Sequence, residues 1–219
     1  VANSAGHNIR VLNLSFSAGP RSFYWNDPLN QAVMAAWQAG IVVVASAGNT
    51  GPNAMSIGAP GNVPYVITVG ATTDNYTPDD PSDDRLASFS SAGPTVEGFV
   101  KPDLVAPGGH LASFMQAGTY LADAYSDYRL NDQYFQMSGT SQAAAVVSGI
   151  VALLLQDEPW LTPDEVKYRL LATARPAVYD SGSGAAVYTV FQQGAGLVNA
   201  YDAVHSDLVG SANQNLDVT

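Results

Sequence analysis

A serine stands where a run of small residues meets a long apolar segment. Met137-Ser138-Gly139-Thr140-Ser141 precedes the alanine- and valine-rich stretch 142–155. A hydroxyl at the start of a helix lies at the positive end of the helix dipole, and backbone N–H groups there can face a developing oxyanion. Ser141 is therefore a candidate nucleophile, although serine is also a common helix N-cap.

Two further segments follow expected strands. Asn49 comes just after the valine-rich run 41–45. Ligands in open α/β sheets bind beyond the carboxyl ends of strands, where an Asn amide can stabilise an oxyanion. The alternative is that Asn49-Thr50-Gly51 is only a turn. The second segment, residues 14–19, is rich in small residues, and its extended backbone could pair with a peptide as an added strand.

The elements that must position these residues alternate along the chain. A strand at 10–15, a helix from Asp27-Pro28 to Gly40 and a strand at 41–45 form a βαβ unit. We also expect strands at 65–69 and 103–106, and helices at 141–156 and 162–173, the last opened by a capping box. This order predicts an α/β fold with a largely parallel sheet.

Five motifs in one order resemble the subtilisin-like serine proteases, and the match runs from about residue 8 to 204. They are Ala47-Gly48-Asn49, Ser88-Phe89-Ser90-Ser91-Ala92-Gly93-Pro94, Lys101-Pro102-Asp103-Leu104-Val105-Ala106-Pro107-Gly108, Ser138-Gly139-Thr140-Ser141 and Gly194-Ala195-Gly196-Leu197-Val198-Asn199-Ala200. The resemblance implies a three-layer fold, with helices on both faces of the sheet.

The resemblance also implies roles for individual residues. Ser141 would attack the scissile carbonyl, and Asn49 with the Ser141 backbone N–H would stabilise the oxyanion. Gly58 would form the floor of the primary specificity pocket and leave room for a large apolar or aromatic side chain. Pro60 falls where the family carries a cis proline. The two opposite pocket walls would be Leu14, Ser15, Phe16 and Ser17, and Ala45, Ser46, Ala47 and Gly48.

The expected catalytic base has no candidate. The mechanism needs a histidine oriented by an aspartate, which the family carries in Asp-Ser/Thr-Gly and His-Gly-Thr/Ser-His motifs upstream of the matched segments. Neither motif precedes those segments here, and His7, His110 and His205 match no catalytic position. We therefore expect residues 1–205 to be the C-terminal, nucleophile-bearing portion of a catalytic domain, and residues 206–219 a polar tail. A second chain carrying the N-terminal half would complete an otherwise incomplete sheet.

Composition narrows the class of partner. The net charge of −11 would repel nucleic acid and anionic membranes, and the longest apolar stretch, 143–155, is too short to span a bilayer. Charged residues make up only 12% of the chain, and there is no cysteine. These features favour a secreted protein acting on protein or peptide substrates, with adaptation to high salt as the alternative reading of the acidic charge.

Other readings stay open. The chain could be an inactive subtilisin-like scaffold or a peptide-binding fragment. The acid peptidases called sedolisins share the fold and the Ser-Gly-Thr-Ser segment, but their oxyanion residue is an aspartate where this chain has Asn49. No cofactor is required. Structural calcium is conceivable at Asp79, Asp80, Asp83 and Asp84, where an acidic surface loop without a ligand is the preferred interpretation.

Overall fold

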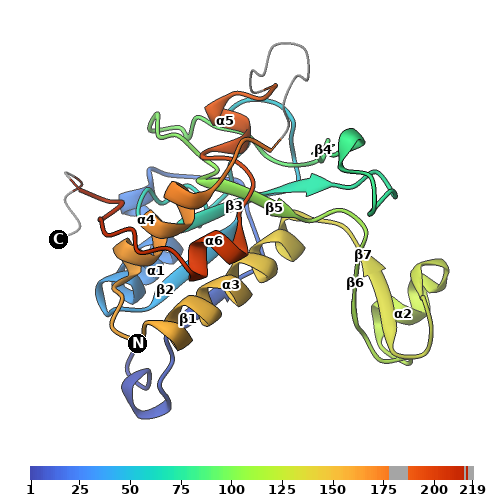
Figure 1. Ribbon diagram of the computed structural model, residues 1–219, viewed down its shortest axis with the longest axis horizontal. Helices are drawn as coiled ribbons and strands as arrows, with labels where there is room; N and C mark the ends of the chain where they lie inside the picture. The colour runs from blue at the N-terminus through green and yellow to red at the C-terminus, as the bar shows by residue number, and fades with distance from the viewer. Residues whose placement is uncertain (178–186, 215, 217–219) are drawn as a thin grey trace.

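A five-stranded sheet forms the centre of the computed structural model, which describes residues 1–177, 187–214 and 216 (Figure 1). Strands β1 (Val11–Leu14), β2 (Val42–Ser46) and β3 (Ile67–Thr73) pair in parallel in that order. Strand β5 (Leu104–Pro107) pairs in parallel with β3, and the short β4 (Arg85–Leu86) pairs antiparallel with the end of β3. The predicted α/β architecture is thus confirmed.

The predicted βαβ unit is present, and local chemistry explains its boundaries. Helix α1 (Pro28–Gln38) begins with proline at its first position, and the Asp27 side chain accepts hydrogen bonds from the N–H groups of Leu29 and Asn30. Such a cap satisfies backbone donors that have no partner within the helix. All five residues of β2 are buried, as expected for a strand covered on both faces.

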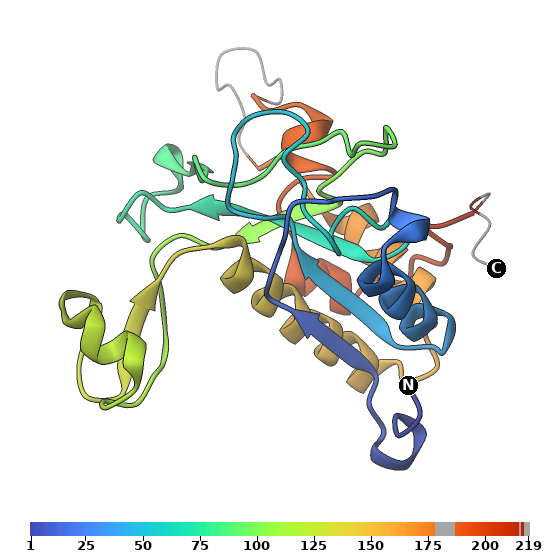
Figure 2. The same ribbon diagram turned by 180° about the vertical axis from the view of Figure 1, so that it is seen from behind.

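Helices cover both faces of the sheet. Helix α3 (Thr140–Asp157) packs against β1, β2, β3 and β5, whereas α1 lies on the other face (Figures 1 and 2). Beside α3 lies α6 (Ala200–Val204), which also contacts α4 (Pro163–Thr173). The predicted capping box opens α4 through Thr162 and Glu165. The remaining α-helix of the sheet body, α5, spans Val190–Gln193.

Helix α3 is, by length and composition alone, apolar enough to cross a membrane, the one such helix within the described ranges. Its buried side includes Val147, Val151 and Leu154, each with no exposed surface. Packing across four strands explains this composition, since the core helix of a globular protein is apolar for the same reason.

Two features differ from the sequence-based expectation. Strand β3 begins two residues later than predicted and continues to Thr73, because pairing with β4 and β5 holds Gly70 and Ala71 extended despite their low β propensity. Residues 111–137, here called the arm, form a hairpin that projects from the body (Figure 1). The arm consists of β6 (Leu111–Phe114), α2 (Tyr120–Ala124), a 3₁₀ turn (Ser126–Tyr128) and β7 (Tyr134–Met137).

A buried ionic cluster joins the starts of β3 and β5 to α4. The Asp103 carboxylate lies 2.5 Å from Lys101 Nζ and 3.0 Å from Lys167 Nζ. Both ammonium groups also donate to the carbonyl oxygen of Val66. Burial lowers the pKa of Lys101 to about 7, although the charge of Asp103 opposes that effect. Burial raises the pKa of Asp103, but the two lysines more than offset this and hold it below its usual value.

The cluster predicts a large stability effect at one position. Asp103→Asn would leave two buried ammonium groups without an anion, which is expected to lower the free energy of unfolding by about 3 to 5 kcal/mol. Asp132→Asn is the matched control, because the Asp132 side chain is 94% exposed and pairs with Arg129 at the surface. Denaturant unfolding of both variants tests this. Equal free energies of unfolding for the two variants would show that the buried ionic cluster does not stabilise the fold.

Part of the segment expected to be a polar tail packs on the body. Asn213 is buried, and its side-chain amide donates to the Tyr65 carbonyl and to Asp164. Its Oδ1 accepts a hydrogen bond from Lys167. Residues 215 and 217–219 of the expected tail lie outside the described residues.

Candidate active site

Ser141 lies in the first turn of α3, as the sequence predicted. Its hydroxyl donates to the carbonyl oxygen of Ser15 at 2.9 Å, and the Ser15 hydroxyl donates to the carbonyl oxygen of Ser141 at 2.8 Å. This reciprocal pair ties the start of α3 to the segment that follows β1. Ser141 is neither fully buried nor fully exposed, so its hydroxyl can be reached from solvent while its backbone is held in place.

Asn49 follows β2 and contacts the start of the same helix. Its Oδ1 accepts hydrogen bonds from Thr140 N at 2.9 Å and Thr140 Oγ1 at 3.0 Å. The Thr140 hydroxyl also accepts from the N–H of Gly48 at 3.2 Å. These contacts fix the orientation of the amide, because Oδ1 must face the helix. The Nδ2 donor makes no hydrogen bond to any described residue, and Asn49 is exposed.

A cavity of about 270 Å³ brings the candidate residues together. Four of the predicted wall and floor residues line it, along with both candidate catalytic residues. The full lining is Ser17, Ala18, Gly19, Ser46, Gly48, Asn49, Thr50, Ser56, Gly58 and Ser141. We refer to it as the Ser141 cavity. Ala18 and Gly19 belong to the segment 14–19 that the sequence singled out for pairing with a peptide, but neither they nor Thr50 was predicted to line the pocket. Sequence reasoning missed Ser56, which lies two residues before the predicted floor residue Gly58.

The other predicted wall residues do not line the Ser141 cavity. Leu14 packs against the core, and Ala45 and Ala47 are fully buried. Ser15 instead holds Ser141, as described above. Phe16 is exposed, and its carbonyl oxygen accepts a hydrogen bond from the Ser46 hydroxyl at 2.9 Å, which links the two walls.

Gly58 is required by close packing. A Cβ atom at this position would lie 1.9 Å from Ser17 Oγ and 2.8 Å from the carbonyl oxygen of Ala18. Ala18 is also bridged to Ala59 by two backbone hydrogen bonds, so that wall cannot retreat freely. Any side chain at residue 58 would therefore displace the wall as well as fill the cavity. The Ala59–Pro60 peptide bond is cis, as the resemblance implied.

A model of the Subtilase family of peptidases (Peptidase_S8) matches residues 1–201. The chain belongs to the subtilase family. The serine protease AprX of Bacillus subtilis is 47% identical over 178 residues, which is 81% of this chain and 38% of AprX. Subtilisin DY of Bacillus licheniformis is 35% identical over 170 residues, covering 77% of this chain and 50% of that protein.

Solved structures that superpose on this chain have the same fold. The patellamide maturation protease PatA superposes with a TM-score of 0.66 at 26% identity, over 93% of this subtilase and 64% of PatA. Sphericase superposes with a TM-score of 0.67 at 24% identity, over 90% and 59% of the two chains. This subtilase therefore spans at most half of the curated relatives named above, and about two thirds or less of the solved ones.

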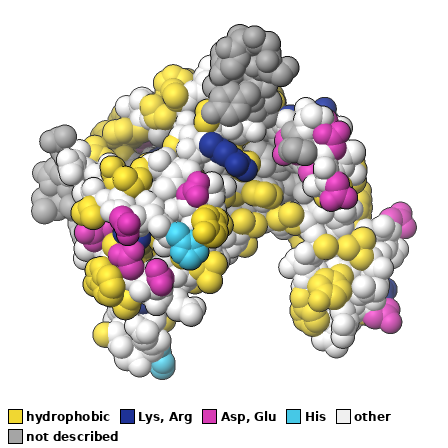
Figure 3. Space-filling view, in the orientation of Figure 1, with side chains coloured by type: hydrophobic (Ala, Val, Ile, Leu, Met, Phe, Trp, Pro, Cys, Tyr) yellow, Lys and Arg dark blue, Asp and Glu magenta, His cyan; other side chains and the backbone are white. Residues whose placement is uncertain are grey.

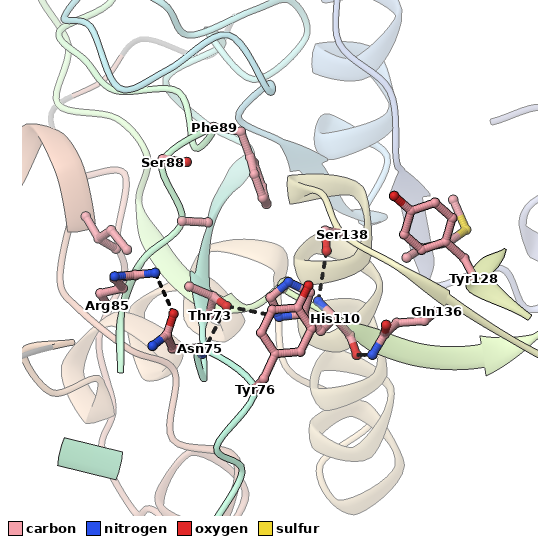
Figure 4. Close-up of a pocket in the computed structure, with 14 residues that line it drawn as sticks. Thr73, Asn75, Tyr76, Arg85, Ser88, Phe89, His110, Tyr128, Gln136 and Ser138 are labelled. Atoms are coloured by element: carbon pink, nitrogen blue, oxygen red, sulfur yellow. Dashed lines mark hydrogen bonds between the residues drawn. The ribbon is translucent and has the colours of Figure 1, made fainter. Parts of the chain in front are cut away.

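Among the residues that the structure describes, no histidine lines the Ser141 cavity of this subtilase. His7 is in a 3₁₀ turn (Ala5–His7) before β1, and His205 follows α6. His110 follows β5, where its ring stacks on Tyr76 with centroids 3.5 Å apart (Figure 4). The letters Asp-Ser-Gly do occur once, at residues 180–182, but after Ser141 and outside the described residues.

His110 lines a second cavity, of about 780 Å³, at the base of the arm. This arm-base cavity shares no lining residue with the Ser141 cavity. Its lining consists of Thr73, Asn75, Tyr76, Arg85, Leu86, Ala87, Ser88, Phe89, Gly109, His110, Tyr128, Gln136, Met137 and Ser138.

The acidic loop considered for calcium is held by internal hydrogen bonds. Asp83 accepts from Thr77 Oγ1 at 2.6 Å and from Asn75 Nδ2 at 3.0 Å, contacts that lower its pKa. Asp80 accepts from the N–H of Ser82. Within the described ranges, no group of three or more His, Cys, Asp or Glu side chains could hold a metal ion.

Proposed function

We propose that this subtilase is a serine endopeptidase component that cleaves peptide bonds through an acyl-enzyme on Ser141. The observation that carries the proposal is the Asn49 amide. Its oxygen accepts a hydrogen bond from Thr140, and its N–H₂ group has no partner among the described residues. Asn49 also lines the same cavity as Ser141. A fixed donor beside a nucleophile is the arrangement that stabilises a tetrahedral oxyanion.

In the proposed reaction, Ser141 Oγ attacks the substrate carbonyl carbon and its proton passes to a histidine base. The carbonyl oxygen becomes an oxyanion that accepts hydrogen bonds from Asn49 Nδ2 and the Ser141 N–H. Collapse breaks the C–N bond, and the protonated histidine gives its proton to the leaving amine. Water then hydrolyses the ester by the same steps. The Ser141 hydroxyl must first turn away from the Ser15 carbonyl, which requires only rotation about its side-chain bond.

We further propose that an N-terminal portion, in the same polypeptide or a second chain, supplies the histidine and aspartate. The free edge of β1 supports this, because β1 is an end strand of the described sheet and pairs only with β2. An added strand would pair with this edge and bury it. The primary specificity pocket would accept a large apolar or aromatic side chain of the substrate. We also propose that the protein is secreted, with which the acidic, cysteine-free sequence is consistent.

Labelling with a fluorophosphonate tests the proposal, because this probe forms a covalent bond only with an activated serine. The full-length protein is expected to gain one adduct on Ser141, and Ser141→Ala is expected to gain none. Ser148→Ala is the matched control, since Ser148 lies two turns further along α3 and its hydroxyl bonds to Asn13 and Ala144. A full-length protein that is not labelled would favour the alternative, an inactive peptide-binding scaffold. That alternative rests on a specific observation: among the described residues, no histidine lines the Ser141 cavity.

A further inference from the structure

The first turn of α3 leaves one backbone donor unused beside the proposed nucleophile. The N–H of Thr140 donates to Asn49 Oδ1 at 2.9 Å, and the N–H of Gln142 donates to the carbonyl oxygen of Gly139 at 3.1 Å. The N–H of Ser141, between them, has no acceptor among the described residues. Because the start of a helix carries a positive partial charge, this unused donor favours an anion.

Gly139 leaves a space that both proposed oxyanion donors border. A Cβ atom at Gly139 would lie 3.4 Å from Asn49 Nδ2 and 3.7 Å from Ser141 N. An oxyanion takes hydrogen bonds from its donors at about 2.7 to 3.1 Å. An oxyanion that both groups share would therefore lie close to this position. We refer to the volume that a Cβ atom of Gly139 would fill as the Gly139 space.

The side chain of Gln142 borders the same space. Its Oε1 would lie 2.8 Å from the Cβ position, closer than either donor. Helical side chains lean toward the N-terminus of their helix, so the side chain of Gln142 in the first turn of α3 returns over Gly139. The Gln142 amide makes no hydrogen bond to any described residue, and the side chain is half-buried. This amide is therefore available to an atom that enters the Gly139 space.

A substrate can reach the start of α3. The helix begins just after β7, where the arm joins the body (Figure 1). Figure 3 shows that the arm stands apart from the body across a hollow, and α3 begins at the inner end of this hollow. Asn49 is exposed and Ser141 is half-buried. We therefore expect a carbonyl group that lies over Ser141 Oγ to place its oxygen within reach of the Gly139 space.

We propose that Gln142 is a further catalytic residue, whose side-chain amide turns to present Nε2 and donates a third hydrogen bond to the oxyanion formed by attack of Ser141. This inference rests on the proposed function. A half turn about the Cγ–Cδ bond exchanges Oε1 for Nε2 at the same place, and the torsion of a terminal amide is broad. Before attack, Oε1 faces two donors, which is favourable. Once the substrate oxygen carries negative charge, a donor at that place stabilises it and an acceptor repels it. The hydrogen bond forms only as the charge develops, so it raises kcat and leaves KM nearly unchanged.

Gln142→Met in the full-length protein tests the inference, because methionine keeps the length and flexibility of the side chain and removes its N–H donor. With a chromogenic peptide, kcat is expected to fall about tenfold and KM to stay nearly constant. The loss should be smaller than for Asn49, since no other hydrogen bond fixes the Gln142 amide. A peptide aldehyde, whose adduct with Ser141 carries the same oxyanion, should bind about tenfold more weakly. Gln156→Met is the matched control, because Gln156 is an exposed glutamine on the same helix. It should change neither quantity.

Gln142→Glu adds a pH-dependent measurement. Glutamate has nearly the same shape as glutamine, but its ionised carboxylate only accepts hydrogen bonds. We expect kcat to fall about a hundredfold near pH 8, because a negative charge then faces the oxyanion. A protonated carboxyl can donate, and the ordinary pKa of glutamate is about 4.3. The ratio of the variant kcat to that of the unsubstituted protein should therefore rise as the pH falls toward about 5. A purely structural effect of the substitution would not reverse in this way.

The outcomes separate this inference from the proposed function. Unchanged kcat in Gln142→Met would overturn the inference. Increased kcat would also overturn it, because Oε1 would then compete with the oxyanion for the two donors. So would a rise in KM alone. If Ser141 is labelled by the fluorophosphonate and these substitutions have no effect, only this inference is refuted. A full-length protein that neither reacts with the probe nor binds the aldehyde would refute the proposed function, and this inference with it.

Discussion

Residues 1–219 produced alone are expected to cleave peptide substrates at least about 10⁴-fold more slowly than the full-length protein. No described residue that lines the Ser141 cavity is a histidine, and in subtilisin, a relative, loss of one member of the catalytic triad lowers kcat by about 10⁴ to 10⁶. Chromogenic peptide hydrolysis measures this directly. Mixing the chain with the proposed N-terminal portion is expected to restore cleavage, because pairing along the free edge of β1 would bring the histidine to Ser141.

The control for this experiment is an N-terminal portion whose candidate histidine is replaced by alanine. It should bind the chain without restoring cleavage, which distinguishes a missing base from a chain that is merely misfolded on its own. Peptide hydrolysis by residues 1–219 at the rate of the full-length protein would contradict the proposal, since a base would then have to come from the chain itself.

Asn49→Asp in the full-length protein is expected to lower kcat by about 10² to 10³ or more, the range known for loss of one oxyanion donor in subtilisin. The substitution keeps an oxygen that can accept from Thr140, so the start of α3 should remain capped and the thermal midpoint nearly unchanged. It replaces the Nδ2 donor with an oxygen that repels the oxyanion. KM should change little, because the lost interaction strengthens only in the transition state.

Asn49→Ala completes the comparison. It removes the donor and also the acceptor for Thr140, so it should lower kcat by a similar factor and cost about 1 kcal/mol of stability. Kinetics and thermal unfolding of both variants separate the two roles of the side chain. If Asn49→Asp keeps its kcat while Asn49→Ala loses stability, Asn49 serves only to cap the helix.

Local signals in the sequence were sufficient for much of the fold. Asp27-Pro28 marks the start of α1, and the capping box at Thr162 marks the start of α4, since both rest on hydrogen bonds between residues a few positions apart. The valine run of β2 indicates a strand buried on both faces. By contrast, β3 extends past Val69 only because β4 and β5 pair with it. The arm has no periodic pattern strong enough to predict it.

The sequence by itself determined the family, the α/β alternation and the identities of Ser141 and Asn49 as candidates, because these depend on residue types and short spacings. The tertiary structure alone decided how the candidates are used. It placed the Asn49 oxygen on Thr140, 91 residues away, and the Ser141 hydroxyl on Ser15, 126 residues away. It also buried Lys101 and Lys167 around one carboxylate. Such contacts join distant parts of the chain, and their geometry arises only when the strands and helices pack together.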